Sequence, residues 1–189
     1  MLPVDRTGRA VHPALIWMDR RGEAQCRQME RDMGAEFIYA TTGNVSDPFY
    51  TFGELLWFKE NLPSHYERTD CVMQANGYVN LRLTGERTID RAHASITQCF
   101  DVDRGDWSDD MLSAYGIPRS LFPRVVDTDE VIGGVSVLAA RETGIPEGTP
   151  VLGGSVDGAA AALEGGVSHG GAAVEMSGTS SVLLVGTNG

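Results

Sequence analysis

Residues 150–164 read PVLGGSVDGAAAALE, the stretch that decides the fold. Val151-Leu152 predicts a short strand, the glycines after it a tight exit, and residues 158–163 a helix of small side chains. This order puts Asp157 at the carboxyl end of a strand and near the start of a helix, where ligands bind in α/β sheets. A carboxylate there can act as a general base for a hydroxyl proton or cap the helix, and the residues alone favour the cap.

Two shorter segments have polar groups suited to a ligand. Ser177-Gly178-Thr179-Ser180 lies between two apolar runs, and a glycine turn with hydroxyls can present donors to phosphate oxygens. Trp17-Met18-Asp19-Arg20-Arg21 follows an apolar run near the start of the chain. Taken singly, the first segment is favoured as an ordinary hairpin turn, and the second as a strand end before a charged helix.

Apolar periodicity, glycines and prolines predict the remaining elements. Helices are expected over 20–33 (stopped by Gly34), 47–61 (ended by Pro63), around 78–83 (ended by Gly85), from 109 (capped by Ser108), for one turn after Pro118, and over 135–142. Strands are expected over 71–73, 151–152, 172–176 and 181–185.

Both ends of the chain resemble interrupted hairpins. Residues 2–4 and 10–17 predict two strands joined by a turn over 5–8. The strand expected over 181–185 is followed by Gly186-Thr187-Asn188-Gly189, and its Asn-Gly is a strong signal for a type I′ hairpin turn. A frayed tail is the alternative for the second case. We therefore expect this sequence to be the middle of a longer protein.

The composition excludes several classes of protein. A net charge of −11 over 189 residues argues against a nucleic acid or an anionic membrane surface as the main partner, because either requires a cationic face. A hydrophobic content of 42% is too high for a disordered chain. Three cysteines without CxxC spacing and four histidines without metal-ligand spacing predict no disulfide framework and no metal site. We expect a reduced, cytoplasmic compartment.

The segments occur in the order of a known family. They include PALIWMDRR (13–21), the run 42–63 with DPFY, YVNLRLTGE (78–86), the block 90–125 with DWSDDML and GIPRSLFP, GTPVLGGSVDGAAAALEGGV (148–167) and MSGTSSVLL (176–184). Over essentially its whole length the chain resembles the FGGY family of carbohydrate kinases, most nearly the xylulose-kinase-like branch.

This resemblance implies an α/β, actin/hexokinase-like (ribonuclease H-like) fold of two domains, with ATP and the sugar in the cleft between them. Residues 1–167 would form most of the N-terminal domain and 168–189 the start of the C-terminal, nucleotide-binding domain. Asp157 would be the catalytic base that takes the proton of the sugar hydroxyl as it attacks the γ-phosphate of ATP. Mg²⁺ would neutralise the phosphates. The turn formed by Gly178, Thr179 and Ser180 would bind phosphate.

The resemblance also assigns residues to the sugar site, and two of them differ from the residues that the family usually has there. Asp157, Gly158, Phe49, Asp19 and Arg21 would contact the sugar. Gly158 stands where the family usually has Asn or Gln, and Phe49 lacks a hydroxyl at an aromatic position.

The expected function is ATP-dependent phosphorylation of a sugar or polyol, most nearly a pentulose such as xylulose, by a longer parent protein. The 189-residue chain alone is expected to be inactive. One alternative is a non-catalytic sugar-binding or regulatory module of the same fold. Another is an assembly fragment whose exposed edges associate, for example as a homodimer.

Overall fold

The computed structural model describes residues 1–178 and 181–187. Contacts divide the chain into two compact units, Met1–Gly154 and Ser155–Gly189. The predicted boundary between 167 and 168 concerns the two domains of a longer kinase, so it stays a prediction. In the described ranges no helix combines the length and the apolar character needed to cross a bilayer.

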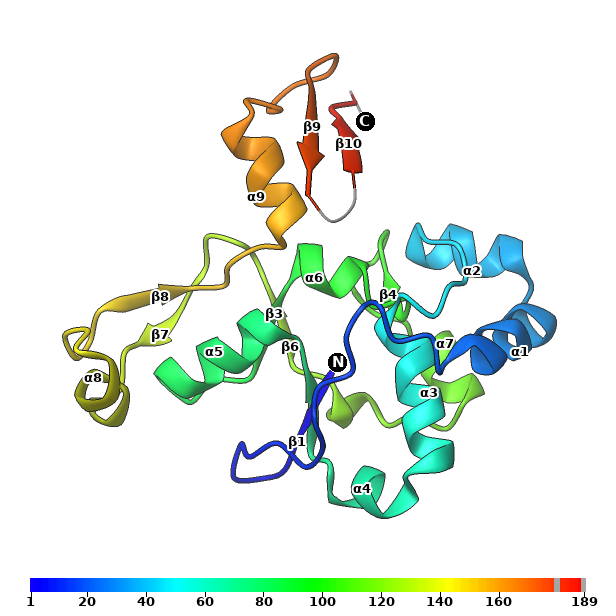
Figure 1. Ribbon diagram of the computed structural model, residues 1–189, viewed down its shortest axis with the longest axis horizontal. Helices are drawn as coiled ribbons and strands as arrows, with labels where there is room; N and C mark the ends of the chain where they lie inside the picture. Colours follow the sequence, from blue (N-terminus) through cyan, green and yellow to red (C-terminus); the bar gives the residue numbers. More distant parts are fainter. Residues whose placement is uncertain (179–180, 188–189) are drawn as a thin grey trace. The chain divides into compact units, whose positions relative to one another are not determined.

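The first unit alternates short strands and helices along the chain (Figure 1). Its helices are α1 (Glu23–Met33), α2 (Ala35–Thr42), α3 (Thr51–Asn61), α4 (Pro63–Arg68), α5 (Ala75–Thr84), α6 (Arg91–Ser95), α7 (Asp109–Ala114), the 3₁₀ turn η1 (Arg119–Leu121) and α8 (Val137–Thr143). Its strands are β1 (Leu2–Val4), β2 (Cys71–Met73), β3 (Thr88–Asp90), β4 (Phe100–Asp101), β5 (Asp106–Trp107), β6 (Arg124–Val126), β7 (Val131–Gly134) and β8 (Pro150–Leu152).

The strands of this unit pair two by two. β3 and β6 are parallel, with Ile89 opposite Val125, and their carboxyl ends lie side by side. The pairs β4–β5 and β7–β8 are antiparallel, and a register shift interrupts the second pair between Val131 and Gly133.

The predicted N-terminal hairpin is wrong in its second strand. β1 pairs antiparallel with β2, about seventy residues away along the chain. The segment after the turn meets β1 in a bridge between Val4 and Ala10 and in a hydrogen bond from Val11 N–H to the Pro3 carbonyl, but it forms no strand. Pro13 lacks the N–H that a ladder requires, and Ile16 and Trp17 are about half exposed. The apolar run over 10–17 is therefore irregular, and it places Leu15 in the core while Ile16 and Trp17 stay exposed.

One helix supplies much of the buried core. Phe52, Leu55 and Phe58 of α3 have no exposed surface, and they pack in a single cluster with Met29 of α1 and Met111 of α7. At about 25 cal/mol per Å² of apolar surface, burying side chains of this size is the main stabilising contribution to the unit.

The predicted helix ends agree with the structure at several positions. Ser108 Oγ accepts the N–H of Met111 at 3.3 Å, which confirms the cap of α7. Gly85 and Gly144 follow α5 and α8 in the left-handed conformation. Pro63 does not simply stop a helix; it begins α4, where its missing N–H is not needed.

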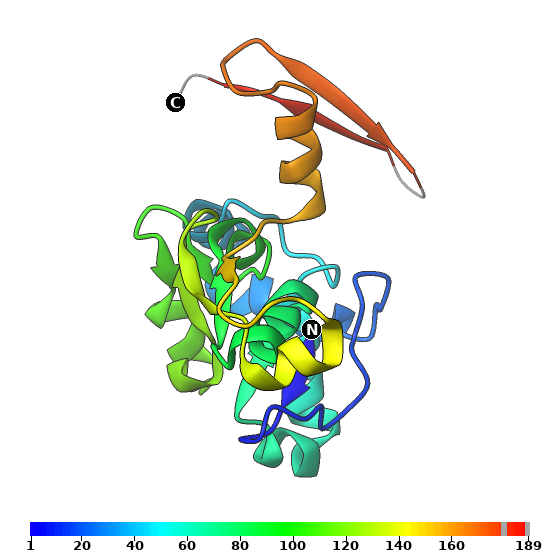
Figure 2. The same ribbon diagram turned by 90° about the vertical axis from the view of Figure 1, so that its left-hand side faces the viewer.

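The second unit contains α9 (Asp157–Glu164), β9 (Ala173–Ser177) and β10 (Ser181–Val185). β9 and β10 form an antiparallel ribbon beside α9 (Figure 2). A Cβ at Gly165, just past α9, would lie 2.6 Å from Val174 Cγ2, so the end of the helix meets the start of β9. From this junction β9 runs back alongside α9 (Figure 1). Because α9 is about 12 Å long and β9 about 13 Å, the start of α9 and the end of β9 lie at the same end of this unit.

Candidate functional site

The WMDRR segment forms a rigid charged pair at the surface of the first unit. Arg21 Nε donates to both carboxylate oxygens of Asp19 at 2.9 Å, and the backbone N–H of Arg21 donates to Asp19 Oδ1 at 3.0 Å. The Arg21 side chain lowers the pKa of Asp19 by hydrogen bonding. Arg21 also lies 4.4 Å from the centre of the Trp57 ring. These contacts fix the orientation of both predicted sugar-binding side chains.

The same segment contacts the DPF segment that contains Phe49. The rings of Trp17 and Phe49 are 6.1 Å apart between centroids, and Arg20 pairs with Asp47 at 3.4 Å. Asp47 in turn accepts the N–H of Phe49 at 2.8 Å, which closes the turn before α3. The structure thus brings Phe49, Asp19 and Arg21 into one region of the first unit, although their segments lie about thirty residues apart.

Trp17 is a candidate residue that the sequence analysis left out of the sugar-binding set. It is 49% exposed and shares an exposed aromatic surface with Phe49, itself 41% exposed. Exposed aromatic rings in contact offer an apolar surface to a ligand, which makes Trp17 a candidate. The available signal was its place at the head of WMDRR, two residues before Asp19.

Glu54 is a second such residue. It is buried on α3, its pKa is raised to about 7 by burial, and the charges of Asp19 and Arg21 also act on it. Glu54 Oε2 lies 3.3 Å from the amino group of Met1. A carboxyl that titrates near neutral pH beside the predicted sugar-binding pair is a functional candidate. Nothing in the sequence pointed to this residue, because Glu54 is a single acidic residue within an apolar helical segment.

Asp157 lies in the second unit, where it is the first residue of α9 and is exposed. Val156 takes the capping position, and Asp157 Oδ1 accepts the N–H of Gly158 at 2.7 Å. The cap that the residues alone favoured for Asp157 is therefore wrong, because Val156 holds that position. Around Gly158 a Cβ would meet nothing within 4 Å, so the surface beside the carboxylate is open.

Gly178 follows β9 and is exposed; a Cβ there would also meet nothing within 4 Å. Thr179 and Ser180, the other two members of the predicted phosphate-binding turn, lie outside the described residues. The start of α9, with Asp157, and the end of β9 lie at the same end of the second unit (Figures 1 and 2).

The turn that leads to Asp157 is anchored in the first unit. Gly153 donates to the Glu130 carbonyl at 2.9 Å, and the buried Asn80 side chain donates to the Gly153 carbonyl at 3.0 Å. A Cβ at Gly153 would overlap the carbonyl of Asp127 and lie 2.9 Å from Val126 Cγ2. Only glycine fits this exit from β8, as the strand-to-turn pattern predicted.

A buried polar cluster lies at the carboxyl end of β3. Asp90 is fully buried; it accepts the N–H of His93 at 3.0 Å, contacts His93 Nδ1 at 2.7 Å and accepts Asn76 Nδ2 at 2.7 Å. Burial opposes ionisation of Asp90, but the hydrogen bonds from His93 and Asn76 outweigh it, and the pKa is lowered. Its contacts make Asp90 the N-cap of α6 and a structural anchor.

The described residues contain no group of three or more His, Cys, Asp or Glu side chains placed to hold a metal ion. Cys26, Cys71 and Cys99 are free and buried, and burial raises their pKa values to about 11, 12 and 12. These thiols are part of the core rather than nucleophiles.

Comparison with known proteins connects these features to one family. Residues 1–164 match the N-terminal domain of the FGGY family of carbohydrate kinases. An L-fuculokinase of Escherichia coli is 38% identical over 149 residues, covering 79% of this chain and 32% of the enzyme. A xylulose kinase of Klebsiella pneumoniae is 32% identical over 186 residues, covering 98% of this chain and 38% of the enzyme. The chain thus spans about a third of the length of these relatives.

Solved structures give the same fold. The crystal structure of xylulose kinase from Rhodospirillum rubrum superposes with a TM-score of 0.92 at 29% identity, covering 97% of this chain and 38% of that one. Plasmodium falciparum glycerol kinase with ADP has a TM-score of 0.89 at 22% identity, covering 97% of this chain and 37% of that one; this likeness shows the fold alone. The expected α/β, actin/hexokinase-like fold is confirmed. With the family match over 164 residues, the chain belongs to the FGGY family of carbohydrate kinases.

Proposed function

We propose that the protein containing this chain transfers the γ-phosphoryl group of MgATP to a hydroxyl of a sugar or polyol. The observation that carries the proposal is an exposed carboxylate, Asp157, at the start of α9, at the same end of the second unit as the end of β9. Phosphoryl transfer depends mainly on positioning and charge neutralisation, and a base beside a phosphate-binding turn supplies both.

In this mechanism the carboxylate of Asp157 accepts the proton of the attacking hydroxyl as the oxygen approaches the γ-phosphorus. The N–H groups of the turn at Gly178, Thr179 and Ser180 hold phosphate oxygens, and the positive end of the α9 dipole adds to their effect. When bound with ATP, Mg²⁺ would supply charge neutralisation to the phosphates, which the acidic chain would otherwise repel.

The sugar would meet Trp17, Phe49, Asp19 and Arg21 of the first unit. The aromatic pair offers a flat apolar surface to the C–H face of a sugar, and the Asp19–Arg21 pair offers fixed acceptors and donors to its hydroxyls. Phe49 cannot hydrogen-bond through its ring, and Gly158 has no side chain. Among the residues of the first unit, the hydroxyl contacts would therefore fall mainly to Asp19 and Arg21.

Among acceptors we place pentuloses such as xylulose first. The support is that xylulose kinases match nearly the whole chain, at 32% identity over 98% and at 29% identity over 97%. L-fuculokinases match at 38% identity over 79% of the chain and at 35% over 96%, so a deoxyhexulose is tested beside the pentuloses. The three free buried thiols support a reduced, cytoplasmic location.

The experiment uses the complete reading frame that contains this chain. ADP release is followed with MgATP and a panel of xylulose, fuculose, glycerol and gluconate. We expect at least one acceptor to raise ADP release at least about 100-fold above the rate without acceptor, since a positioned base alone contributes about 10²–10⁴. The 189-residue chain by itself is expected to release none.

The alternative is a non-catalytic sugar-binding module, favoured by Gly158 and Phe49. It predicts saturable binding of one of these sugars in a calorimetric titration without any sugar-dependent ADP release. That combination of results would replace the kinase proposal.

A further inference from the structure

Two different groups hold the guanidinium of Arg21 in the first unit. Arg21 Nε donates to both oxygens of Asp19 at 2.9 Å, and Arg21 Nη2 donates to Asp19 Oδ2 at 2.5 Å. The guanidinium also lies over the ring of Trp57, with its central carbon 4.4 Å from the ring centre. Asp19 therefore fixes one edge of the guanidinium, and Trp57 covers one of its faces.

Donors remain available on Arg21 after these contacts. A guanidinium has five N–H donors, and Asp19 uses the one on Nε and one on Nη2, so three are left for a ligand. The Arg21 side chain is 46% exposed, so a ligand can reach it. Because the carboxylate holds an edge and the ring holds a face, the two contacts together set the directions in which the remaining N–H groups point.

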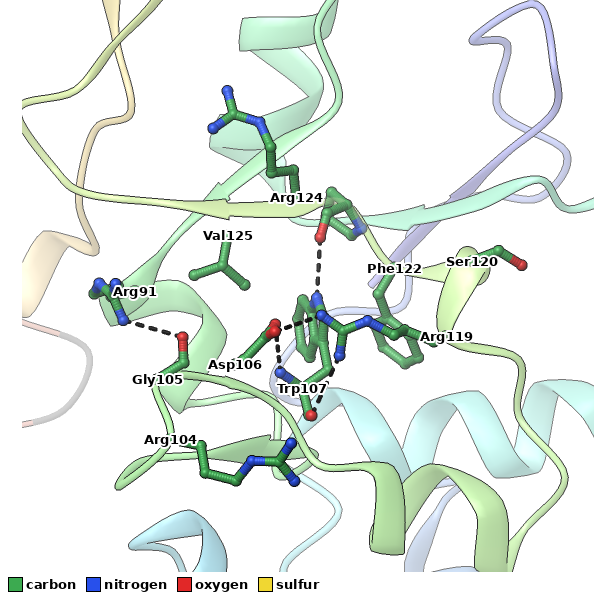
Figure 3. A pocket seen from close by; sticks show the side chains of 11 residues that line it. Arg91, Arg104, Gly105, Asp106, Trp107, Arg119, Ser120, Phe122, Arg124 and Val125 are labelled. Atoms are coloured by element: carbon green, nitrogen blue, oxygen red, sulfur yellow. Dashed lines mark hydrogen bonds and ion pairs between the residues drawn. The ribbon is translucent and has the colours of Figure 1, made fainter.

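Two other arginines of this unit lack the second contact. In the cavity around the β4–β5 hairpin, Arg119 Nη2 pairs with Asp106 at 2.5 Å (Figure 3). Arg91 Nε, in the same cavity, pairs with Asp127 at 2.6 Å. Neither guanidinium lies over an aromatic ring among the residues that the structure describes. The ring of Trp57 thus gives Arg21 a restraint that an ion pair alone does not supply.

Trp57 is itself held in place. It lies on α3 and packs, partly buried, against the main hydrophobic cluster. The start of α3 also contacts the residue after Arg21: a Cβ at Gly22 would lie 2.6 Å from the carbonyl carbon of Gly53. Gly53 comes about one helical turn before Trp57. The same helix therefore fixes the backbone beside Arg21 and the face of its guanidinium.

We propose that Trp57 is a positioning residue of the sugar site, whose ring holds the Arg21 guanidinium so that its free N–H groups meet the sugar hydroxyls already oriented. This inference rests on the proposed function, because it requires Arg21 to bind the sugar. Orienting a side chain before the ligand arrives reduces the entropy lost on binding. Loss of the Trp57 ring should therefore weaken sugar binding through Arg21 and leave the chemical step unchanged.

The first test measures KM and kcat for the preferred acceptor, using the complete reading frame. We expect Trp57→Leu to raise KM about fivefold with kcat within about twofold, because a cation–π contact of this kind contributes about that factor and acts on binding alone. Trp57→Phe keeps an aromatic face under Arg21 and should restore KM to within about twofold of the unchanged protein.

Tyr66→Leu is the matched control for the loss of a ring from the core. Tyr66 lies on α4 and packs, also partly buried, against the same cluster, so this variant should leave KM within about twofold. A double variant then separates positioning from packing. In an Arg21→Gln background, Trp57→Leu should change KM by less than about twofold, because the side chain that the ring positions is absent.

A second readout needs no sugar. In the 189-residue chain, NMR follows the exchange of the Arg21 Nε–H proton with solvent. We expect this exchange to be about fivefold faster in Trp57→Leu, because the guanidinium leaves Asp19 more often without the ring, and to be unchanged in Tyr66→Leu.

Three kinetic results would overturn the proposal: an unchanged KM in Trp57→Leu, an equal rise of KM in Tyr66→Leu, or effects of Trp57→Leu and Arg21→Gln that simply add. Phosphorylation of none of the acceptors would instead contradict the proposed function. In that case the Nε–H exchange decides the positioning role by itself, and an unchanged rate in Trp57→Leu would reject it.

Discussion

At the scale of single residues, Asp90 shows how a buried charge becomes a structural element. It ends β3, caps α6 and contacts Asn76 of α5, so one carboxylate links three elements. A buried carboxylate is tolerated when its oxygens are hydrogen-bonded. An amide in its place keeps one acceptor oxygen, for the His93 N–H, but turns an NH₂ group toward Asn76 Nδ2, so that donor loses its acceptor.

We expect Asp90→Asn to lower the free energy of unfolding by about 2–4 kcal/mol at pH 7. Because the pKa of Asp90 is lowered on folding, its contribution is present above the unfolded value near 3.8 and is lost as the pH falls through the folded value. Urea unfolding at pH 7 and at pH 3 or below should therefore give a smaller difference at the lower pH. Asp109→Asn, with a 64% exposed side chain, is the control. A difference that does not change with pH would contradict this role.

The site residues differ in how far the sequence revealed them. Asp19, Arg21 and Phe49 were assigned from motif order, and the structure brings them into one region. Trp17 was left out of the sugar-binding set although it begins WMDRR, because its packing against the Phe49 ring is visible only in the fold. Glu54 was missed because the burial that raises its pKa cannot be read from an apolar helical pattern.

At the scale of elements, the two glycines on either side of Asp157 differ in whether the structure has room for a side chain. Gly153 leaves β8 against the carbonyl of Asp127, and Gly158 lies in α9 with open space around its Cα. Substitution by alanine should therefore destabilise the protein at Gly153 and stabilise it at Gly158.

We expect Gly153→Ala to lower the free energy of unfolding of the first unit by about 1–3 kcal/mol, because the added methyl group overlaps backbone. Gly158→Ala should stabilise α9 by up to about 1 kcal/mol, since alanine favours a helix over glycine. Urea unfolding measures the first effect, and hydrogen exchange of the α9 amides measures the second. Loss of protection in α9 of Gly158→Ala, or unchanged stability of Gly153→Ala, would be inconsistent with this geometry.

The sequence predicted elements well where the signal depends only on neighbouring residues, such as a helix cap or a glycine after a helix. The cap at Ser108, the glycines after α5 and α8, and the strands over 71–73 and 181–185 are in the structure. The strand expected over 10–17 is wrong because β1 takes a partner distant in sequence. α2 was missed because Gly34, which stops α1, is followed at once by a new helix.

At the scale of the whole molecule, apolar burial is unevenly distributed. Both hydrophobic clusters lie within Met1–Gly154. In the described part of Ser155–Gly189, the side chains of β9 and β10 alternate between exposed and half-buried, and α9 has no buried residue. Recognition of the family from motif order succeeded at this scale because the motifs cover both units.

This distribution predicts unequal local stability. Amides of α3 and β2 should exchange with deuterium at least about 100-fold more slowly than those of β9 and β10, because local opening follows buried contact density. Hydrogen-exchange mass spectrometry of the 189-residue chain makes the comparison. Equal protection in the two units would show that burial within each unit does not govern its stability.

The central claim is that Asp157 accepts the proton of the attacking hydroxyl. It is tested most directly by ³¹P NMR of phosphoryl transfer from MgATP to the preferred acceptor, using the complete reading frame with Asp157→Asn and, as the matched control, Glu164→Gln at the other end of α9. We predict that Asp157→Asn lowers kcat at least about 100-fold with little change in stability, whereas Glu164→Gln stays within about twofold. A new phosphomonoester signal forming at the unchanged rate in Asp157→Asn would contradict the account.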